Sequence, residues 1–252
     1  MGDFQSDDKG LSTGPGLASL GLTLGQLAAY CQPSSQGARP AKVKGGGKTA
    51  KGEPGKDFES LAAEPVTRIV ADSRLAGPGA VFVALKGEFV DGHKYVKAAI
   101  KAGALAALVS EGYRDPLVPE KRLVRVSDPL KALGNLAREV RVRAKPKVVA
   151  VTGSSGKTTV KEMLKSILSL DYDDEEILAT RANFNNALGL PLTILSMSDK
   201  TRLVILEMGA NHFGEIEYLA KIARPDVGLV TGTGFVHLEG FGDRAGVAKA
   251  KA

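Results

Sequence analysis

The feature that most constrains this chain is a glycine-rich loop between an apolar run and an amphipathic segment. Residues 148–152 read VVAVT, which is typical of a buried parallel strand, and residues 153–159 read GSSGKTT. Glycines let a backbone approach phosphate oxygens, and amides at a helix N-terminus point toward an anion. The strand, loop and helix in this order predict a phosphate-binding loop. The following helix is expected to bury one face, made of Val160, Met163, Leu164, Ile167 and Leu168.

The residue types in the loop indicate a nucleotide bound with magnesium. Lys157 is placed to bridge phosphates, and the hydroxyl of Thr158 to hold Mg²⁺. The common pattern has another glycine five residues before Gly156, where this chain has Val151, so the loop is a shortened version. A Gly-Ser turn that only caps a helix is the alternative. The candidate ATP-binding residues are Gly153, Ser154, Ser155, Gly156, Lys157, Thr158 and Thr159.

A second GKT sequence, within GGGKT at residues 45–49, lacks this scaffold, because no buried strand precedes it and no apolar helix follows. From Arg39 to Lys56 there are six basic residues and one acid, so this segment carries +5 of the formal net charge of +6. Its Gly/Pro/Lys-rich composition predicts a flexible, solvated insertion over residues 33–57. The rest of the chain is close to neutral, so the charge does not indicate a nucleic-acid partner.

Composition excludes several classes of protein. Hydrophobic residues make up 43% and charged residues 25% of the 252 residues, which is ordinary for a globular chain. No stretch approaches 18 uninterrupted apolar residues, so no membrane span is expected. The first ten residues contain three aspartates and no apolar core of a secretory signal. The single cysteine, Cys31, fits a reducing compartment, and we expect a cytoplasmic protein.

Strand-like and helical segments alternate along the chain, which predicts an α/β fold with two domains. Residues 1–63 are expected to be a flexible leader that holds a short helix near 22–30 and the basic insertion. Residues 64–144 form a small N-terminal α/β domain, with strands at 66–70, 80–85 and 105–109 and helices at 95–101 and 129–140. Residues 145–252 form a phosphate-loop domain with a mostly parallel sheet, with strands at 148–152, 203–206 and 226–231 and helices at 160–168 and 216–223.

Polar residues follow the strands of the second domain, where open α/β sheets bind ligands. Glu207 ends a strand beside the expected phosphate site, where a carboxylate completes a Mg²⁺ shell or is simply solvated. His237 lies in a glycine-rich loop and is by itself a weak candidate. Asn183, Asn185 and Asn186 fall in a polar connection that either lines the site or forms turns. We take Asn183 and Asn186 as candidate substrate-binding residues.

Several longer segments, read together, resemble one family. They are TGSSGKTT, TRANFNNALGLPLTIL, EMGANHFGEIEYLAKIARPDVGLVT and HLEGFG in the second domain. In the first domain they are DSR at residues 72–74 and PGAVFVALKGEFVDGHKYVKAAIKAGALAALV. The set resembles the Mur ligases of peptidoglycan synthesis over roughly residues 64–252. The EMGAN…GEI segment is most similar to the branch that adds D-alanyl-D-alanine to UDP-N-acetylmuramoyl-tripeptide.

The resemblance implies an ATP-dependent amide ligase of cell-wall biogenesis. ATP would phosphorylate the carboxylate of UDP-N-acetylmuramoyl-tripeptide, and the D-alanyl-D-alanine amine would attack the acyl phosphate. Lys157 would be catalytic, and Thr158 and Glu207 would hold one Mg²⁺. His237 and a carbamylated Lys251 would be catalytic and bind a second metal. Ser73 and Arg74 would contact the uridine-diphosphate end of the substrate.

The sequence departs from the family pattern in two places. Residues 231–234 read TGTG where the family usually has Thr-Asn-Ile-Gly, and the insertion at 33–57 is not a family feature. Further central-domain strands and a C-terminal domain are expected in the family beyond Ala252, so we expect an incomplete central domain and no C-terminal domain. Two alternatives stay open. One is a related Mur ligase that adds a single amino acid, and the other is an inactive nucleotide- or UDP-sugar-binding fragment.

Overall fold

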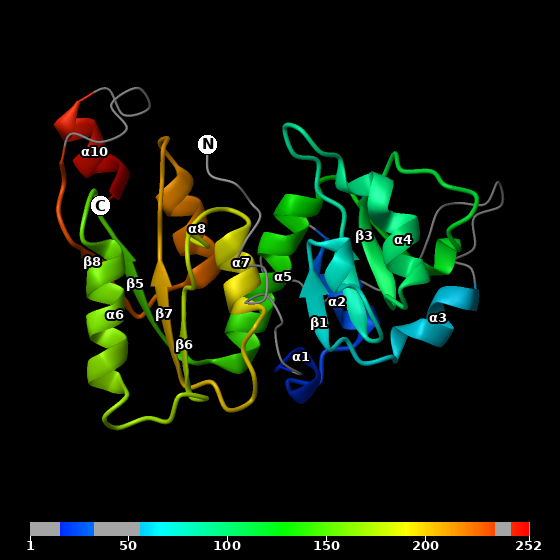
Figure 1. Ribbon diagram of the computed structural model, residues 1–252, viewed down its shortest axis with the longest axis horizontal. Helices are drawn as coiled ribbons and strands as arrows, with labels where there is room; N and C mark the ends of the chain where they lie inside the picture. Colours follow the sequence, from blue (N-terminus) through cyan, green and yellow to red (C-terminus); the bar gives the residue numbers. More distant parts are fainter. Residues whose placement is uncertain (1–15, 33–55, 235–242, 252) are drawn as a thin grey trace. The chain divides into compact units, whose positions relative to one another are not determined.

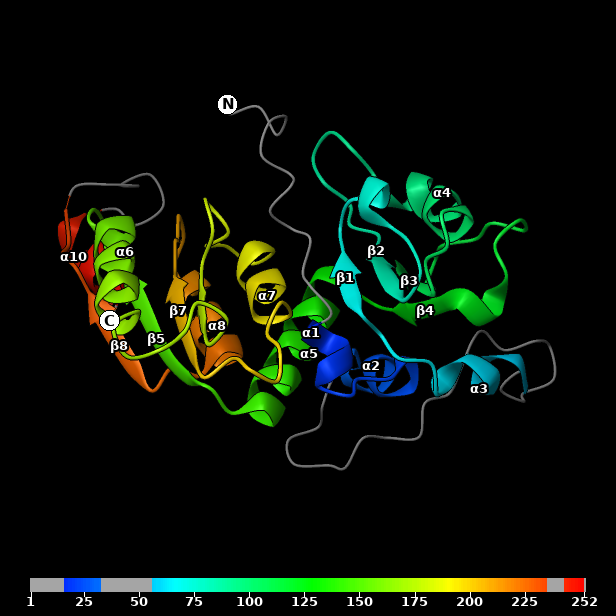
Figure 2. The same cartoon turned by 60° about the horizontal axis from the view of Figure 1, so that its bottom comes forward.

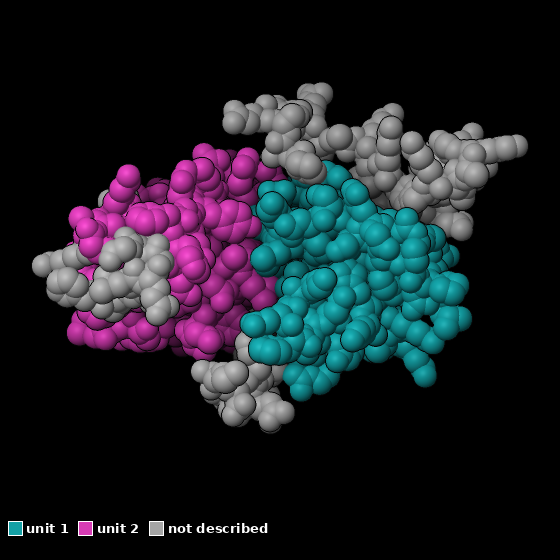
Figure 3. Space-filling model, turned by 90° about the horizontal axis from the view of Figure 1, so that it is seen from above, with its two compact units in different colours: residues 1–136 teal, residues 137–252 magenta. Residues whose placement is uncertain are grey.

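The computed structural model describes residues 16–32, 56–234 and 243–251. The chain divides into two compact units, residues 1–136 and 137–252 (Figure 3). Each unit holds its own sheet of four parallel strands, which confirms the predicted α/β class. In the described residues, no helix combines the length and the apolar character that crossing a membrane requires.

The first unit is built on a sheet in the order β1-β2-β3-β4. Its strands are β1 (Arg68–Val70), β2 (Ala80–Val83), β3 (Ala106–Ser110) and β4 (Leu123–Val126), the last of which the sequence analysis missed. Short 3-10 helices η2 (Ser73–Leu75), η3 (Gly92–Tyr95) and η4 (Glu120–Arg122) interrupt the connections, and α4 (Val96–Lys101) follows η3. Phe82 of β2 belongs to one hydrophobic core with Val96 and Ala99 of α4. Figure 2 shows α4 on one side of this sheet and α1 and α2 on the other.

The short helix predicted near 22–30 is confirmed, whereas residues 16–21, predicted to be flexible, are folded. The predicted leader contains α1 (Gly16–Ser19), α2 (Leu24–Tyr30) and α3 (Lys56–Ala62), and the last of these begins inside the predicted insertion. Leu17 and Leu22 are fully buried, and the amide of Val66 donates to the Leu22 carbonyl. Apolar burial therefore ties this segment to the chain that enters β1. Residues 1–15 and 33–55, which include the GGGKT sequence, lie outside the described residues.

The second unit has a sheet in the order β6-β7-β5-β8 (Figure 1). Its strands are β5 (Lys147–Thr152), β6 (Ile177–Ala179), β7 (Leu203–Glu207) and β8 (Val227–Val230). Its helices are α6 (Lys157–Leu168), α7 (Gly189–Ile194), α8 (Glu215–Ala223) and α10 (Arg244–Lys251). The central position of β5 brings the loop that follows it between its two neighbours, β7 and β8. The sequence analysis missed β6, α7 and α10.

Helix α6 packs on this sheet with a narrower face than predicted. Val160, Leu164 and Leu168 lie against a core of Val151, Ile177 and Ile205, as expected. Met163 and Ile167, which were predicted on the same face, are 59% and 62% exposed. Val160, Leu164 and Leu168 form one row along the helix, and Met163 and Ile167 lie on its exposed flank.

Helix α5 (Pro129–Ala144) links the two sheets. The predicted boundary at residue 144 is where α5 ends, whereas the compact units divide after Leu136, inside the helix. The second half of α5 is tied to the second unit by Arg141. Its guanidinium donates to the carbonyls of Ala223 and Arg224 at 3.0 Å and to the carboxylate of Asp226 at 3.1 Å.

Arg141 therefore caps the C-terminal end of α8, whose last carbonyls have no partner within the helix. The chain leaves α8 through Arg224 in the left-handed conformation (φ 45°). Asp226 also accepts the amide of Val148 at 2.8 Å. That hydrogen bond, together with Lys147 and Arg141, lowers the pKa of the Asp226 carboxyl group, so it stays charged near neutral pH. One guanidinium thus joins α5, α8 and the start of β8.

We predict that Arg141→Ala destabilises the second unit by about 2–4 kcal/mol, because it removes the donor to the carbonyls of Ala223 and Arg224 and one of the partners of the Asp226 carboxylate. Arg138→Ala is the matched control on the same helix. Arg138 forms a partly exposed ion pair with Glu139 at 3.8 Å, so a change under about 0.5 kcal/mol is expected. Urea denaturation of both variants measures the difference. Equal stability of the two variants would contradict the capping role.

Candidate active site

The predicted phosphate-binding loop lies between β5 and α6. Gly156 precedes the helix with a φ of 79°, a left-handed conformation that favours glycine. Gly153 has a φ of 149°, and a Cβ built on it would lie 2.0 Å from Oγ1 of Thr231. Both glycines of GSSGKTT are therefore required by the backbone. The reading of this segment as a helix-capping turn does not explain the close approach at Gly153.

The chain after β8 braces this loop from the other side. The amide of Ser154 donates to the carbonyl of Gly232 at 2.9 Å, and the amide of Gly234 donates to Oγ of Ser154 at 2.8 Å. The hydroxyl of Thr231 donates to the carbonyl of Ser155 at 2.5 Å. Gly232 and Gly234 thus contact the loop through backbone atoms. These contacts do not need the asparagine side chain that the family usually has in this stretch.

Two of the predicted lysines come together at the loop. Nζ of Lys157 donates to the carbonyl of Gly153 at 2.9 Å, so the side chain folds back over the loop. Lys251, on α10, is buried. Burial, and after it the nearby Lys157 cation, lowers the pKa of the Lys251 ammonium. His237, the remaining predicted metal ligand, lies outside the described residues.

Glu207 is buried and has three hydrogen-bonding partners, two of which bond its carboxylate. Its side chain ends β7 and is only 3% exposed, so the solvated alternative is wrong. Oε2 accepts the hydroxyl of Thr158 at 2.8 Å, and Oε1 accepts Nδ2 of Asn185 at 2.9 Å. The backbone amide of Glu207 donates to Oγ1 of Thr180 at 3.0 Å. The first residues of α6 and the end of β7 are therefore joined through this side chain.

The three asparagines of the connection after β6 have different roles. Asn186 accepts the amides of Leu188 and Gly189 with its side-chain oxygen at 3.0 and 2.9 Å, which caps the start of α7. Asn183 is exposed, and its carbonyl accepts the amide of Asn185 at 2.8 Å. Only Asn185 contacts Glu207, although Asn183 and Asn186 were the predicted site residues. Spacing alone could not choose among three asparagines within four residues.

The side chains around Glu207 suit a magnesium ion. Within the described residues, no group of three or more His, Cys, Asp or Glu side chains is placed to hold a metal. Mg²⁺ in nucleotide sites usually takes one or two protein oxygens and completes its shell with water and phosphate oxygens. The carboxylate of Glu207 and the hydroxyl of Thr158, 2.8 Å apart, are such a pair. The donor set therefore fits the metal inferred from the sequence.

The predicted substrate contacts of the first unit follow β1. Ser73 and Arg74 lie in η2, which Asp72 caps by accepting the amide of Arg74 at 2.9 Å. Nε of Arg74 donates to both carboxylate oxygens of Asp72 at 3.0 and 2.9 Å. The side chain of Arg74 is 74% exposed, so the guanidinium is held by one carboxylate while it faces solvent. A charge held in this way is accessible to an anionic ligand.

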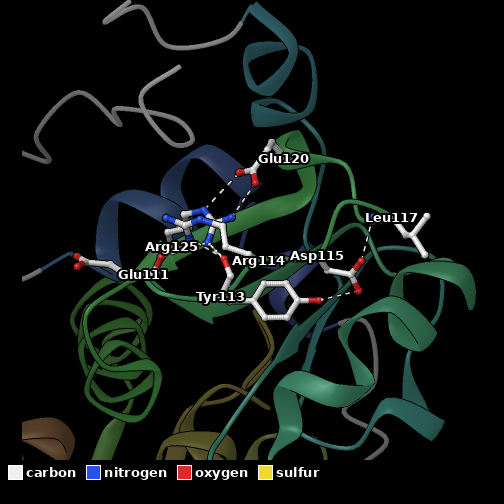
Figure 4. Close-up of polar contacts among 7 residues, drawn as sticks. All are labelled: Glu111, Tyr113, Arg114, Asp115, Leu117, Glu120 and Arg125. Carbon is white, nitrogen blue, oxygen red and sulfur yellow. Dashed lines mark hydrogen bonds and ion pairs between the residues drawn. The ribbon is translucent and has the colours of Figure 1, made fainter. Parts of the chain in front are cut away.

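The loop after β3 lies at the same sheet edge and is fixed by two arginines (Figure 4). Nη1 of Arg125 donates to the carbonyl of Tyr113 at 2.5 Å, while its Nη2 pairs with Glu120 at 2.7 Å. Arg114 donates to the carbonyls of Glu111 and Tyr113 at 2.6 Å. The sequence analysis missed this cluster, because arginines that bond backbone carbonyls leave no spacing signal.

We predict that Gly153→Ala destabilises the second unit by about 1–3 kcal/mol, since the new methyl group would meet Thr231 and the backbone conformation disfavours alanine. Gly228→Ala, in β8 of the same sheet, is the control, because its added Cβ would meet nothing within 4 Å. Thermal denaturation of the two variants compares the same chemical change at a crowded and an open position. A loss at Gly228 as large as that at Gly153 would contradict the steric argument.

Comparison with known proteins gives the family. The description "Mur ligase family, catalytic domain" matches residues 65–141, and "Mur ligase middle domain" matches residues 151–252. UDP-N-acetylmuramoyl-tripeptide–D-alanyl-D-alanine ligase of Haemophilus influenzae is 45% identical over 74% of this chain and 40% of its own length. The Escherichia coli protein of the same name is 44% identical over 73% of this chain and 39% of its own length. The chain thus spans about 40% of the length of these relatives.

Solved structures agree with the sequence relatives. The crystal structure of MurF from Acinetobacter baumannii matches with a TM-score of 0.69 and 42% identity, over 76% of this chain and 41% of that one. MurF ligase from Thermotoga maritima, solved in complex with ADP, matches with a TM-score of 0.66 and 38% identity, over 73% and 42%. Both family domains and both sets of relatives lead to one conclusion: the chain belongs to the Mur ligase family.

Proposed function

We propose that this chain serves an ATP-dependent ligase that joins D-alanyl-D-alanine to UDP-N-acetylmuramoyl-tripeptide in peptidoglycan precursor synthesis. One observation carries the proposal: a buried carboxylate, Glu207, is bonded to Thr158 of a phosphate-binding loop. The relatives named above supply the substrates, since their names state the tripeptide and the dipeptide. They also favour this reaction over a Mur ligase that adds a single amino acid.

The loop residues are suited to the phosphoryl-transfer step. The γ-phosphoryl group of ATP would pass to the tripeptide carboxylate and form an acyl phosphate, with ADP leaving. Lys157 and the amides of the loop would stabilise the charge on the transferring group. Mg²⁺, held by Thr158 and Glu207, would supply further neutralisation of phosphate charge when bound. Lys157 would exchange the carbonyl of Gly153 for phosphate oxygens as the nucleotide enters.

The second step is the attack of the dipeptide amine on the acyl phosphate. The attack forms a tetrahedral intermediate, which expels inorganic phosphate and leaves the new amide bond. His237 and Lys251 are proposed for a second metal, as the resemblance implies. Burial and Lys157 lower the pKa of Lys251, and the neutral amine is the form that reacts with CO₂ to give a carbamate and a proton. The carbamate would replace a cation beside Lys157 with an anion.

The first unit is proposed to hold the uridine-diphosphate end of the substrate. Ser73 and Arg74 follow β1 at the carboxyl edge of the sheet, the usual ligand side of a parallel sheet. Asp72 orients the Arg74 guanidinium before a diphosphate arrives. Asn183 and Asn186 stay predicted substrate contacts. Asn186 would contact the substrate through its side-chain nitrogen, because its side-chain oxygen accepts the amides of Leu188 and Gly189.

We predict that Lys157→Ala weakens the binding of ADP with Mg²⁺ by about 10- to 100-fold, because it removes the cation that meets the phosphates. Lys48→Ala, in the second GKT sequence, is the matched control and should change the affinity less than twofold. Isothermal titration calorimetry measures both. Equal losses from the two substitutions would refute the assignment of residues 153–159 as the nucleotide loop.

A second prediction concerns the substrate. Arg74→Ala should weaken the binding of UDP-N-acetylmuramoyl-tripeptide by about tenfold, the value of one charge-assisted contact to a diphosphate. Lys131→Ala removes an exposed cation of α5 that is 3.8 Å from Asp128, and it should leave the affinity unchanged. Titration with UDP alone shows whether the lost contact is to the diphosphate. An unchanged affinity in Arg74→Ala would remove this residue from the substrate site.

A further inference from the structure

A buried lysine next to the candidate active site has no part in the chemistry described so far. Lys161 lies on α6, one turn after Lys157, and is only 3% exposed. Its Nζ donates to the carbonyl of Thr180 at 2.8 Å and pairs with Oε1 of Glu162 at 2.8 Å. Placing a charged ammonium group in the interior is costly unless it is paired. The acceptor of Lys161, the carbonyl of Thr180, lies at the end of β6, where the pairing with β7 stops.

Thr180 follows β6 and extends its pairing with β7 by one bond, because its amide donates to the carbonyl of Ile205 at 2.9 Å. In a regular parallel ladder, the next bond would run from the amide of Glu207 to the carbonyl of Thr180. Here Lys161 occupies that carbonyl. The amide of Glu207 donates instead to the side-chain hydroxyl of Thr180 at 3.0 Å. Thr180 is 1% exposed, so no solvent replaces either contact.

Because of this exchange of partners, the ladder between β6 and β7 ends at Ile205, two residues before the candidate metal ligand. The chain then turns away from the sheet through Ala182, which has a φ of 47°. The turn brings Asn185 back to β7, where its carbonyl accepts the amide of Gly209 at 2.8 Å and its side chain reaches Glu207. A Cβ on Gly209 would lie 3.0 Å from the Asn185 side chain, so this return is close-packed. Figure 1 shows α6, β6 and β7 as neighbours.

We propose that Lys161 and Thr180 are positioning residues that hold the Glu207 carboxylate in the orientation that binds a divalent metal with the nucleotide. The proposal rests on the proposed function of Thr158 and Glu207. Neither residue touches the metal. Thr180 fixes the backbone of Glu207, while Lys161 keeps the Thr180 carbonyl from taking that amide. Asn185 and Thr158 then fix the two carboxylate oxygens.

The test compares Thr180→Val with Thr180→Ser in the full chain. Valine keeps the shape of threonine but cannot accept the Glu207 amide, whereas serine keeps the hydroxyl. The probe is ADP, titrated by calorimetry with MgCl₂ and again with EDTA. The measured quantity is the factor by which Mg²⁺ increases ADP affinity. We expect Thr180→Val to reduce this factor about tenfold with little change in EDTA, and Thr180→Ser to restore it.

Lys161→Met provides the second arm, with Lys165→Met, one turn further along α6, as its control. Methionine keeps the length of the lysine stem and removes the ammonium group. We expect Lys161→Met to reduce the Mg²⁺ factor as Thr180→Val does, and Lys165→Met to leave it unchanged. Should Lys161→Met fail to fold, the valine and serine pair still decides the question.

Three outcomes would overturn the inference. A Mg²⁺ factor in Thr180→Val equal to that of the unaltered chain shows that Glu207 needs no positioning. Equal losses of affinity with MgCl₂ and with EDTA show a merely structural role. Absence of any ADP binding by the unaltered chain refutes the proposed function itself, and this inference with it. That last result is distinguishable, because it appears before any substitution is made.

Discussion

The arrangement of the second unit depends on the burial of one carboxylate. Glu207 is 3% exposed at the end of β7, and a buried charge is tolerated only with close hydrogen-bonding partners. The two carboxylate oxygens accept the hydroxyl of Thr158 at the start of α6 and the side-chain amide of Asn185 in the connection to α7, while the backbone amide of Glu207 donates to Thr180 after β6. Each segment must begin, end or turn at a fixed residue if its donor or acceptor is to lie within hydrogen-bonding distance of Glu207. Glu207 thus joins the end of β7 to the start of α6, the end of β6 and the connection to α7.

The order of the parallel strands places Glu207 next to the phosphate-binding loop. Because β5 lies between β7 and β8, the loop after β5 is bordered by Glu207 on one side and by Thr231 on the other. Thr231 bonds the carbonyl of Ser155, and Glu207 bonds the hydroxyl of Thr158. The loop is therefore held at both borders before any nucleotide binds. Amides held in this way need no reorganisation when charge develops on a phosphate.

The sequence predicted the features that are formed by consecutive residues. It did not predict those that depend on contacts between residues far apart in the chain. The loop at 153–159 was predictable because strand, glycines and helix follow one another. The choice of Asn185 over its two neighbours depends on a turn that Thr180 and Ala182 begin, so composition could not reveal it. Thr231 acts on residues nearly eighty positions earlier. The short strands β4 and β6 gave little periodicity, and the leucines of the leader were hidden among Gly and Ser. Arg141, likewise, is recognisable only once α8 is seen to end beside it.

The shortened loop also has a physical explanation. The position where the common motif has its first glycine is Val151, which is fully buried in the core beneath α6. Val151 pairs in register with Glu207, and its carbonyl accepts the amide of Met208 at 2.8 Å. A glycine there would lose that packing and loosen the strand next to the carboxylate. With β5 continuing to Thr152, fewer residues remain to form the loop. Thr231 and residues 232–234 brace this loop through hydrogen bonds, so its rigidity depends on the chain that follows the neighbouring strand β8.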